Sequence, residues 1–205
     1  MKKSTLATLS LVCLMSASTV FADSKEGNHQ SMGNMQFGNA VLSSAEFKDL
    51  HHSGNLQLNN VKVAHSLIVN GKLNAKESIL HELTINGDSK LKDVTLSGPT
   101  SINGHLEAQD SKFNGPVTIH GHLSAKGSSF KEPIKVRSTN TNFENSTLHD
   151  ITIEKSRSGE KEYLNLEGTK IEGNVKFESG TGIVRLDDKS SITGKVTGGT
   201  VEKNS

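Results

Sequence analysis

An aliphatic side chain recurs at every seventeenth position through the middle of the chain, and this repeat constrains the fold more than any other feature. The column consists of Ile68, Ile85, Ile102, Ile119, Val136 and Ile153. A strict repeat of this kind is typical of a solenoid, in which each period forms one coil stacked on the coil before it. From about Gly38 to Val201 the pattern predicts roughly ten coils, which at the ordinary strand spacing make a rod about 50 Å long.

Each coil contains three pairs of inward residues, and the two members of a pair are two positions apart. In one coil the pairs are Val117/Ile119, Leu123/Ala125 and Ser128/Phe130. Spacing by two predicts a short strand with one face turned inward, so three pairs per coil predict a triangular cross-section. Neighbouring coils repeat the pairs in register, as parallel strands about 4.8 Å apart require. The fold class is therefore all-β, a single-stranded, three-sided parallel β-helix.

A recurring glycine marks the corner between the first and second faces. Its positions are Gly54, Gly71, Gly87, Gly104 and Gly121. Glycine suits a turn that needs positive φ. At Ser138 the glycine is missing, and the next inward pairs fit best as Thr141/Phe143 and Ser146/Leu148, so this corner is expected to be one residue longer. The alternative register would bury Asn140, Asn142 and Asn145, which is costly if any amide is unpaired.

Residues 155–162, KSRSGEKE, interrupt the pattern with a charged stretch. Such a stretch is too polar to pack inward, so we expect a loop or hairpin that protrudes from one corner. It is the most individual part of the surface, and we therefore predict a partner contact there. The residues expected to make that contact are Lys155, Arg157, Glu160, Lys161 and Glu162.

Residues 1–22 have the pattern of a secretory signal peptide. Lys2 and Lys3 precede an apolar run that ends in the small-residue pattern Val20-Phe21-Ala22. A transmembrane anchor is the alternative, but serines interrupt the run, and a span needs about 20 predominantly apolar residues. The only cysteine, Cys13, lies inside this segment, so the mature chain is expected to have no disulfide. Residues 23–36 carry no period and are predicted to be flexible, and the solenoid domain is predicted over residues 37–203.

The charge balance excludes one class of partner. Without Lys2 and Lys3 the chain keeps 21 basic against 22 acidic residues. No basic field is available to attract nucleic acid or an anionic membrane, so neither is expected as a partner. After signal cleavage no integral membrane span is expected either.

The unit Ile102-Asn103-Gly104-His105-Leu106-Glu107-Ala108 resembles the repeat of the bactofilins, bacterial polymer-forming proteins. The resemblance covers most of the mature chain, including Ile192-Thr193-Gly194-Lys195-Val196. It implies a right-handed, three-sided β-helix and end-to-end assembly. The export signal is a departure, because bactofilins typically act on the cytoplasmic side.

Nine histidines suggest a metal site. Asp88, His105 and His122 follow corner glycines in successive coils, and His120 is two residues from His122. Imidazoles about 5 Å apart with a carboxylate beside them could hold Zn²⁺ or another divalent ion. The alternative is that these are solvated corner residues, since Asn55 and Lys72 occupy the same column.

These features predict an exported, non-enzymatic solenoid. No Ser-His-Asp set and no close pair of carboxylates occupies positions where side chains would converge, so no catalytic residue and no obligatory cofactor is expected. The predicted role is a structural, self-associating or adhesive element of the bacterial cell envelope or surface, located in the periplasm, at the cell surface or outside the cell. Self-association is expected through the solenoid ends, because open strand edges can pair with another chain. The alternative is a small secreted protein that binds a metal or ligand at the His/Asp patch.

Overall fold

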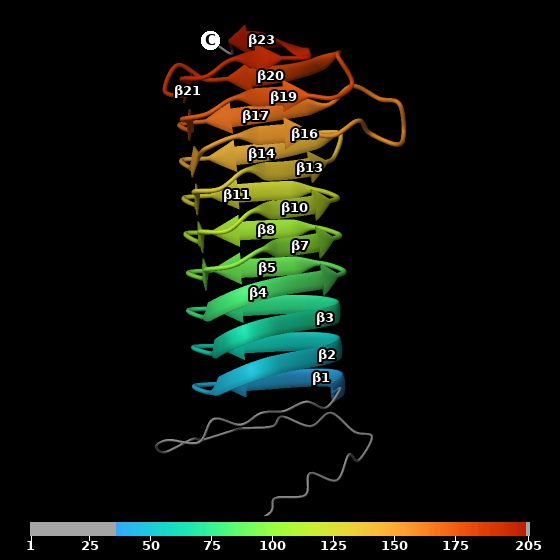
Figure 1. Ribbon diagram of the computed structural model, residues 1–205, viewed down its shortest axis with the longest axis vertical. Coiled ribbons are helices and arrows are strands. Elements are labelled where there is room, and N and C mark those ends of the chain that lie inside the picture. The colour runs from blue at the N-terminus through green and yellow to red at the C-terminus, as the bar shows by residue number, and fades with distance from the viewer. Residues whose placement is uncertain (1–35, 204–205) are drawn as a thin grey trace, which may run out of the picture.

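A computed structural model of the chain describes residues 36–203. The predicted signal peptide and residues 23–35 of the predicted flexible segment lie outside the described residues, and Gln36 is the first residue of strand β1. Residues 36–203 contain 23 parallel β-strands and no helix. The strands wind into a columnar β-solenoid of about ten turns, which confirms the predicted fold class (Figure 1).

The strands lie on three faces of the column. In the N-terminal coils, long strands continue around the corners: β1 (Gln36–Ser43), β2 (Glu46–Asn59), β3 (Lys62–Lys76) and β4 (Ile79–Asn86). The later strands of the first face are β7 (Thr100–Asn103), β10 (Val117–His120), β13 (Ile134–Arg137), β16 (Ile151–Ile153), β19 (Val175–Phe177) and β22 (Val196–Thr197). Those of the second face are β5 (Ser89–Lys92), β8 (Leu106–Gln109), β11 (Leu123–Lys126), β14 (Asn140–Glu144), β17 (Tyr163–Glu167), β20 (Gly182–Leu186) and β23 (Gly199–Lys203). Those of the third face are β6 (Thr95–Leu96), β9 (Lys112–Phe113), β12 (Ser129–Phe130), β15 (Thr147–Leu148), β18 (Lys170–Ile171) and β21 (Ser191–Ile192).

The core is a single narrow column of mainly aliphatic side chains along the axis. In two middle coils the third face contributes a phenylalanine and the inward residue of the second face is small, because the interior must be filled without overlap. Phe113 and Phe130 stack with ring centroids 4.4 Å apart, and their coils carry Ala108 and Ala125 on the second face. Phe143 meets Phe130 edge to face at 5.7 Å.

The glycines of the first corner are required by the stacking itself. At Gly104 φ is +150°, and a Cβ there would overlap the carbonyl oxygen of Gly87 in the coil below. Gly121 has the same relation to Gly104. A side chain is therefore excluded twice, by the backbone conformation and by the neighbouring coil.

The corner at Ser138 is longer, as the sequence predicts. Leu106 pairs with Leu123 in the coil above, 17 residues on, whereas Leu123 pairs with Thr141, 18 residues on, so the chain uses one more residue to complete this coil. Thr141 and Phe143 are buried, whereas Asn142 lies at the surface. The alternative register with inward asparagines does not occur.

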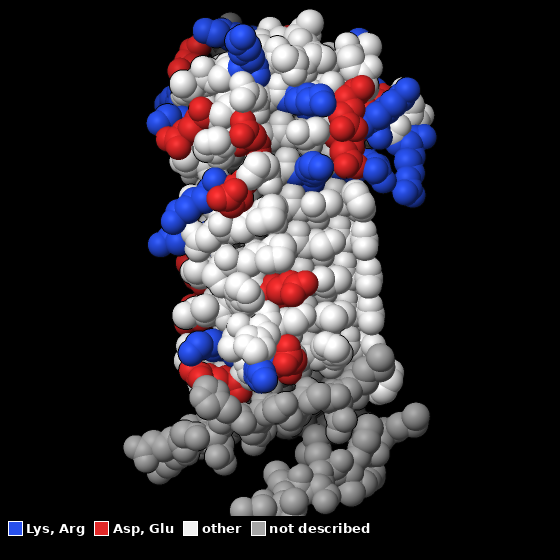
Figure 2. All heavy atoms as spheres, in the orientation of Figure 1, with Lys and Arg blue, Asp and Glu red and all other residues white. Residues whose placement is uncertain are grey.

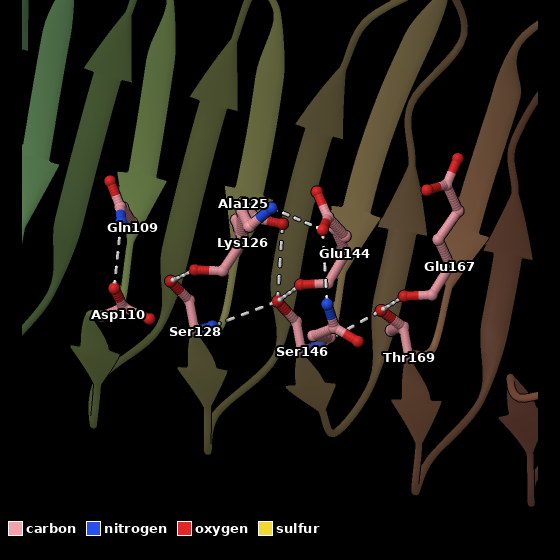
Figure 3. A network of polar contacts seen from close by, with 10 residues as sticks. Gln109, Asp110, Ala125, Lys126, Ser128, Glu144, Ser146, Glu167 and Thr169 are labelled. Carbon is pink, nitrogen blue, oxygen red and sulfur yellow. Dashed lines mark hydrogen bonds and ion pairs between the residues drawn. The ribbon is translucent and has the colours of Figure 1, made fainter.

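The second corner is built on a buried column of hydroxyl groups (Figure 3). Ser146 Oγ accepts a hydrogen bond from Ser128 N at 3.1 Å and donates to the carbonyl of Glu144 at 2.9 Å. Ser128 and Thr169 repeat this arrangement in the adjoining coils. The hydroxyl groups thus satisfy buried backbone donors that no strand reaches, which explains why serine occupies an inward position of an otherwise apolar core.

The predicted inward column is wrong at Ile68. Leu67 pairs with Leu83 and Val69 pairs with Ile85, so Ile68 lies opposite Thr84 on the outside of the sheet. The cause is a register shift between Val63 and Ser66, which makes this coil one residue shorter than the coil above it. Because side chains alternate along a strand, a shift of one residue turns Ile68 outward.

Candidate functional site

The first corner carries the histidines that the sequence singles out. His105 Nδ1 lies 3.0 Å from Asp88 Oδ1 in the coil below, and the rings of His105 and His122 are 5.9 Å apart between centroids. The ring N–H of His105 donates to Asp88 and holds the pKa of that carboxyl below its usual value. The structure thus brings Asp88, His105 and His122 into one column, as their spacing predicts.

His120 lies on the other side of the corner glycine, at the end of an amide ladder. Asn103 Nδ2 donates to Asn86 Oδ1 at 2.9 Å, and His120 Nδ1 contacts Asn103 Oδ1 at 3.0 Å. In the next coils the ladder becomes ionic, because Arg137 Nη2 lies 2.5 Å from Glu154 Oε2. His120 Nε2 is 3.8 Å from the same carboxylate oxygen.

The three imidazoles share one hydrogen-bonding arrangement. The Nδ1 of His122 contacts the carbonyl oxygen of Asn140 at 3.1 Å, so each Nδ1 faces an oxygen atom that can only accept. Nδ1 must then carry the hydrogen in each ring, and Nε2 remains for a ligand in His105 and His122, whereas Nε2 of His120 faces Glu154.

These residues do not form a metal-ligand set in the structure. The carboxylate of Asp88 is hydrogen-bonded to Nδ1 of His105, so the two groups bind each other. His120 faces Glu154 and not the other two rings. Among residues 36–203 no group of three or more His, Cys, Asp or Glu side chains is placed to hold a metal ion. A divalent metal at this corner remains a prediction without geometric support.

Residues 154–162 replace the first corner of the coil above Ser138 and protrude from the column beside β16 (Figure 1). Lys155, Arg157, Glu160 and Lys161 are exposed there. Glu162 is only 1 % exposed, and its Oε1 accepts a hydrogen bond from Ser156 N at 2.7 Å. Glu162 thus differs from the other four residues predicted for a partner contact. It is turned inward, where its carboxylate accepts the hydrogen bond that a buried oxygen requires, and it anchors the loop.

A groove of about 670 Å³ joins the histidine corner to this loop. Its lining comes from four successive coils and consists of Asn103, Gly104, His105, His120, Gly121, His122, Arg137, Ser138, Thr139, Ser156, Arg157 and Ser158. The sequence indicates the histidines and the insertion as two separate features. Only the lengthened corner at Ser138, which lies between them, brings both to one place.

A second, smaller hollow of about 240 Å³ lies on the second face, beside the network of Figure 3. Lys126 Nζ and Glu144 Oε1 form an ion pair across it at 2.6 Å, and the pKa of Lys126 is raised by that carboxylate. Lys126, the cationic side chain of its lining, is thus already paired with a carboxylate.

The side of the molecule in Figure 2 has few charged side chains over the middle coils and many around the C-terminal coils. The described residues contain no helix with the length and apolar character needed to cross a membrane. Comparison of the chain with models of protein families, with curated proteins and with solved structures found no match.

Proposed function

We propose that the protein is an exported, non-enzymatic β-solenoid that serves as a structural, self-associating or adhesive element of a bacterial cell envelope or surface. The observation that carries this proposal is the C-terminal end of the column. In the described residues β21, β22 and β23 pair only with the coil below them, so their outer edges can accept further strands.

The same end also presents part of the apolar axis. Val201 is 48 % exposed, and Ile192 and Val196 are partly buried where the core ends. Stacking a second molecule on this end would cover these side chains and continue the parallel hydrogen bonding, which supports assembly along the axis. The likeness to bactofilins in the Ile102–Ala108 unit favours the same mode of assembly.

Analytical ultracentrifugation and electron microscopy of the purified mature chain test this role. We expect particles whose length is a multiple of one column, and we expect the double substitution Val196→Glu and Val201→Glu to leave monomers, because it places charges on the contact. Ile79→Lys is the matched control: Ile79 is 54 % exposed on the side of the column and not at its end, so assembly should persist. A wild-type chain that stays monomeric at high concentration would contradict self-association.

Export is tested separately. Residues 1–30 fused to an alkaline phosphatase that lacks its own signal should give active enzyme outside the cytoplasm, because the phosphatase needs disulfides to fold. Replacing Leu11, Val12 and Leu14 by aspartate should abolish the activity.

A further inference from the structure

The groove at the first corner has unused hydrogen-bond donors. Arg157 lines it with an exposed guanidinium that makes no ion pair or hydrogen bond within residues 36–203. The hydroxyl of Thr139 likewise bonds to no other described group. A guanidinium has five N–H donors in a planar fork that matches a carboxylate or phosphate group.

The neighbouring carboxylates are already paired. Glu154 is held by Arg137 at 2.5 Å, and Asp88 accepts from His105 at 3.0 Å. Glu162 is turned inward on Ser156 N. An incoming anion would therefore meet donors on the groove wall, whereas Glu162, whose Oε2 has no hydrogen-bond partner among residues 36–203, is buried and does not line the groove.

The imidazoles extend this lining. Because Nδ1 of His105 and His122 is occupied by an oxygen acceptor, each of these rings has Nε2 left, and a protonated ring offers Nε2–H as a donor. Nε2 of His120 already faces Glu154 Oε2 at 3.8 Å, so His120 lines the wall without a free donor. The rings come from two adjacent coils, and Arg157 lies beyond them in the loop above. The donors are thus spread along the groove over several coils.

We propose that this corner groove is a binding site for an oxyanion, the phosphate or carboxylate group of a ligand, with Arg157 as its principal contact and the histidine rings beside it. The role goes beyond structural assembly and does not depend on it, because the groove lies on the side of the column and not at its ends.

The lengthened corner explains why the site exists only here. In the coils below, the tight glycine corner allows no extra residue, and no loop overhangs it. The added residue at Ser138 and the loop above it create the hollow, and the internal bonds Ser156 Oγ–Ser158 Oγ at 2.8 Å and Ser158 Oγ–Glu160 Oε2 at 3.2 Å order the loop.

Nuclear magnetic resonance of the histidine rings tests the proposal. The purified chain is titrated with sodium phosphate while sodium chloride keeps the ionic strength constant, and sodium acetate and a galacturonate oligomer serve as carboxylate probes. We expect saturable shifts of the His105, His120 and His122 signals with a Kd of about 1 mM or tighter for at least one probe. Saturation by phosphate alone or by the carboxylates alone identifies which group the ligand carries, and either result supports the site.

Variants separate a specific site from general attraction. Arg157→Ala should weaken binding about tenfold. Arg185→Ala removes the same charge away from the groove, where Arg185 stacks on Tyr163 at 4.4 Å, and should leave affinity within about twofold. Arg157 is exposed in a loop, so the fold should survive, as a circular dichroism melt would verify. Equal weakening by both substitutions, or no saturable shift with any probe, would overturn the proposal.

Discussion

The first corner is built in two ways along one column. From Gly54 to Gly121 each glycine packs against the backbone of the glycine below, and the chain turns with no residue to spare. At Ser138 and in the coil above it the corner is longer, first by one residue, then by the protruding loop 154–162. The difference teaches that tight stacking at a corner excludes insertions, and that one lapse in the glycine column releases the next corner for a loop.

The side-chain ladders beside this corner change at the same place. In the lower coils amides bond to amides, as Asn86 does to Asn70 at 2.7 Å. At the change the ladder passes through His120 to the Arg137–Glu154 ion pair. Neutral, repeated contacts support the regular region, whereas charged and unrepeated contacts line the region that carries the groove.

The largest effect should come from adding a methyl group to a tight corner. Gly104→Ala should lower the free energy of unfolding by at least about 2 kcal/mol, because its Cβ would overlap the backbone of Gly87 at positive φ. Gly180→Ala tests the longer type of corner. Gly180 also has positive φ, +79°, but nothing lies within 4 Å of the added Cβ, so the cost should be about 1 kcal/mol. Urea unfolding measures both, and equal costs would refute the distinction between the corners.

At the second corner, Ser111 in the regular region and Ser146 beside the groove should behave alike, because each hydroxyl accepts a hydrogen bond from a buried backbone N–H of the coil below. Ser111→Ala and Ser146→Ala should each cost about 1–3 kcal/mol by leaving a buried backbone N–H without its acceptor. Thr147→Ala, at an exposed neighbouring position, should cost under about 0.5 kcal/mol. A large cost at Ser146 with none at Ser111 would show that the second corner also differs between the regions.

The loop should depend on its buried anchor. Glu162→Ala removes the acceptor for Ser156 N, so trypsin should cleave at Lys155, Arg157 and Lys161 several times faster, as mass spectrometry of timed digests would show. Glu160→Ala changes an exposed carboxylate of the same loop and should alter the rate much less. Similar rates for both variants would mean that Glu162 does not hold the loop.

The smallest effect concerns acid. Asp150 has a lowered pKa because Asn174 N donates to its carboxylate at 2.7 Å, and the pKa of Asp187 is lowered by hydrogen bonds from Ser190 Oγ and Gly168 N. A carboxyl with a lower pKa in the folded state stabilises the fold above its unfolded pKa of about 3.9, and that contribution is lost as the pH falls through the folded value.

Amide hydrogen exchange should therefore show the amides of Gly168 and Asn174 losing protection first as the pH drops below about 4. Asp187→Asn should make Gly168 less dependent on pH over this range. An unchanged pH profile in that variant would contradict the role given to Asp187.

The regular part of the fold follows from the sequence because inward side chains repeat at fixed steps. The three pairs, the glycine corner and the extra residue at Ser138 are all confirmed. The prediction is wrong at Ile68. The coil that contains Ile68 is one residue shorter than the coil above it, and this shift exchanges the inward and outward sides of its strand. Leu67 and Val69, which flank Ile68, are the available signal.

The groove could not be predicted, because it depends on how a loop without a period lies against the column. Nothing local in the sequence distinguishes Glu162 from Glu160, yet one is buried and the other is exposed. The histidines are found by their spacing, but the orientation of each ring is set by Asp88, Asn103 and Asn140 in other coils.

The stacked glycine corner also has a consequence for how such a gene can change. In the regular region every coil meets equivalent partners above and below, so duplication of a whole unit such as residues 87–103 would repeat each contact and lengthen the column by one strand spacing, about 4.8 Å. Copying a segment that is not a whole coil would place a side chain against the carbonyl of a corner glycine. Column length can therefore evolve in whole steps, while the groove near the C-terminal coils keeps its own geometry.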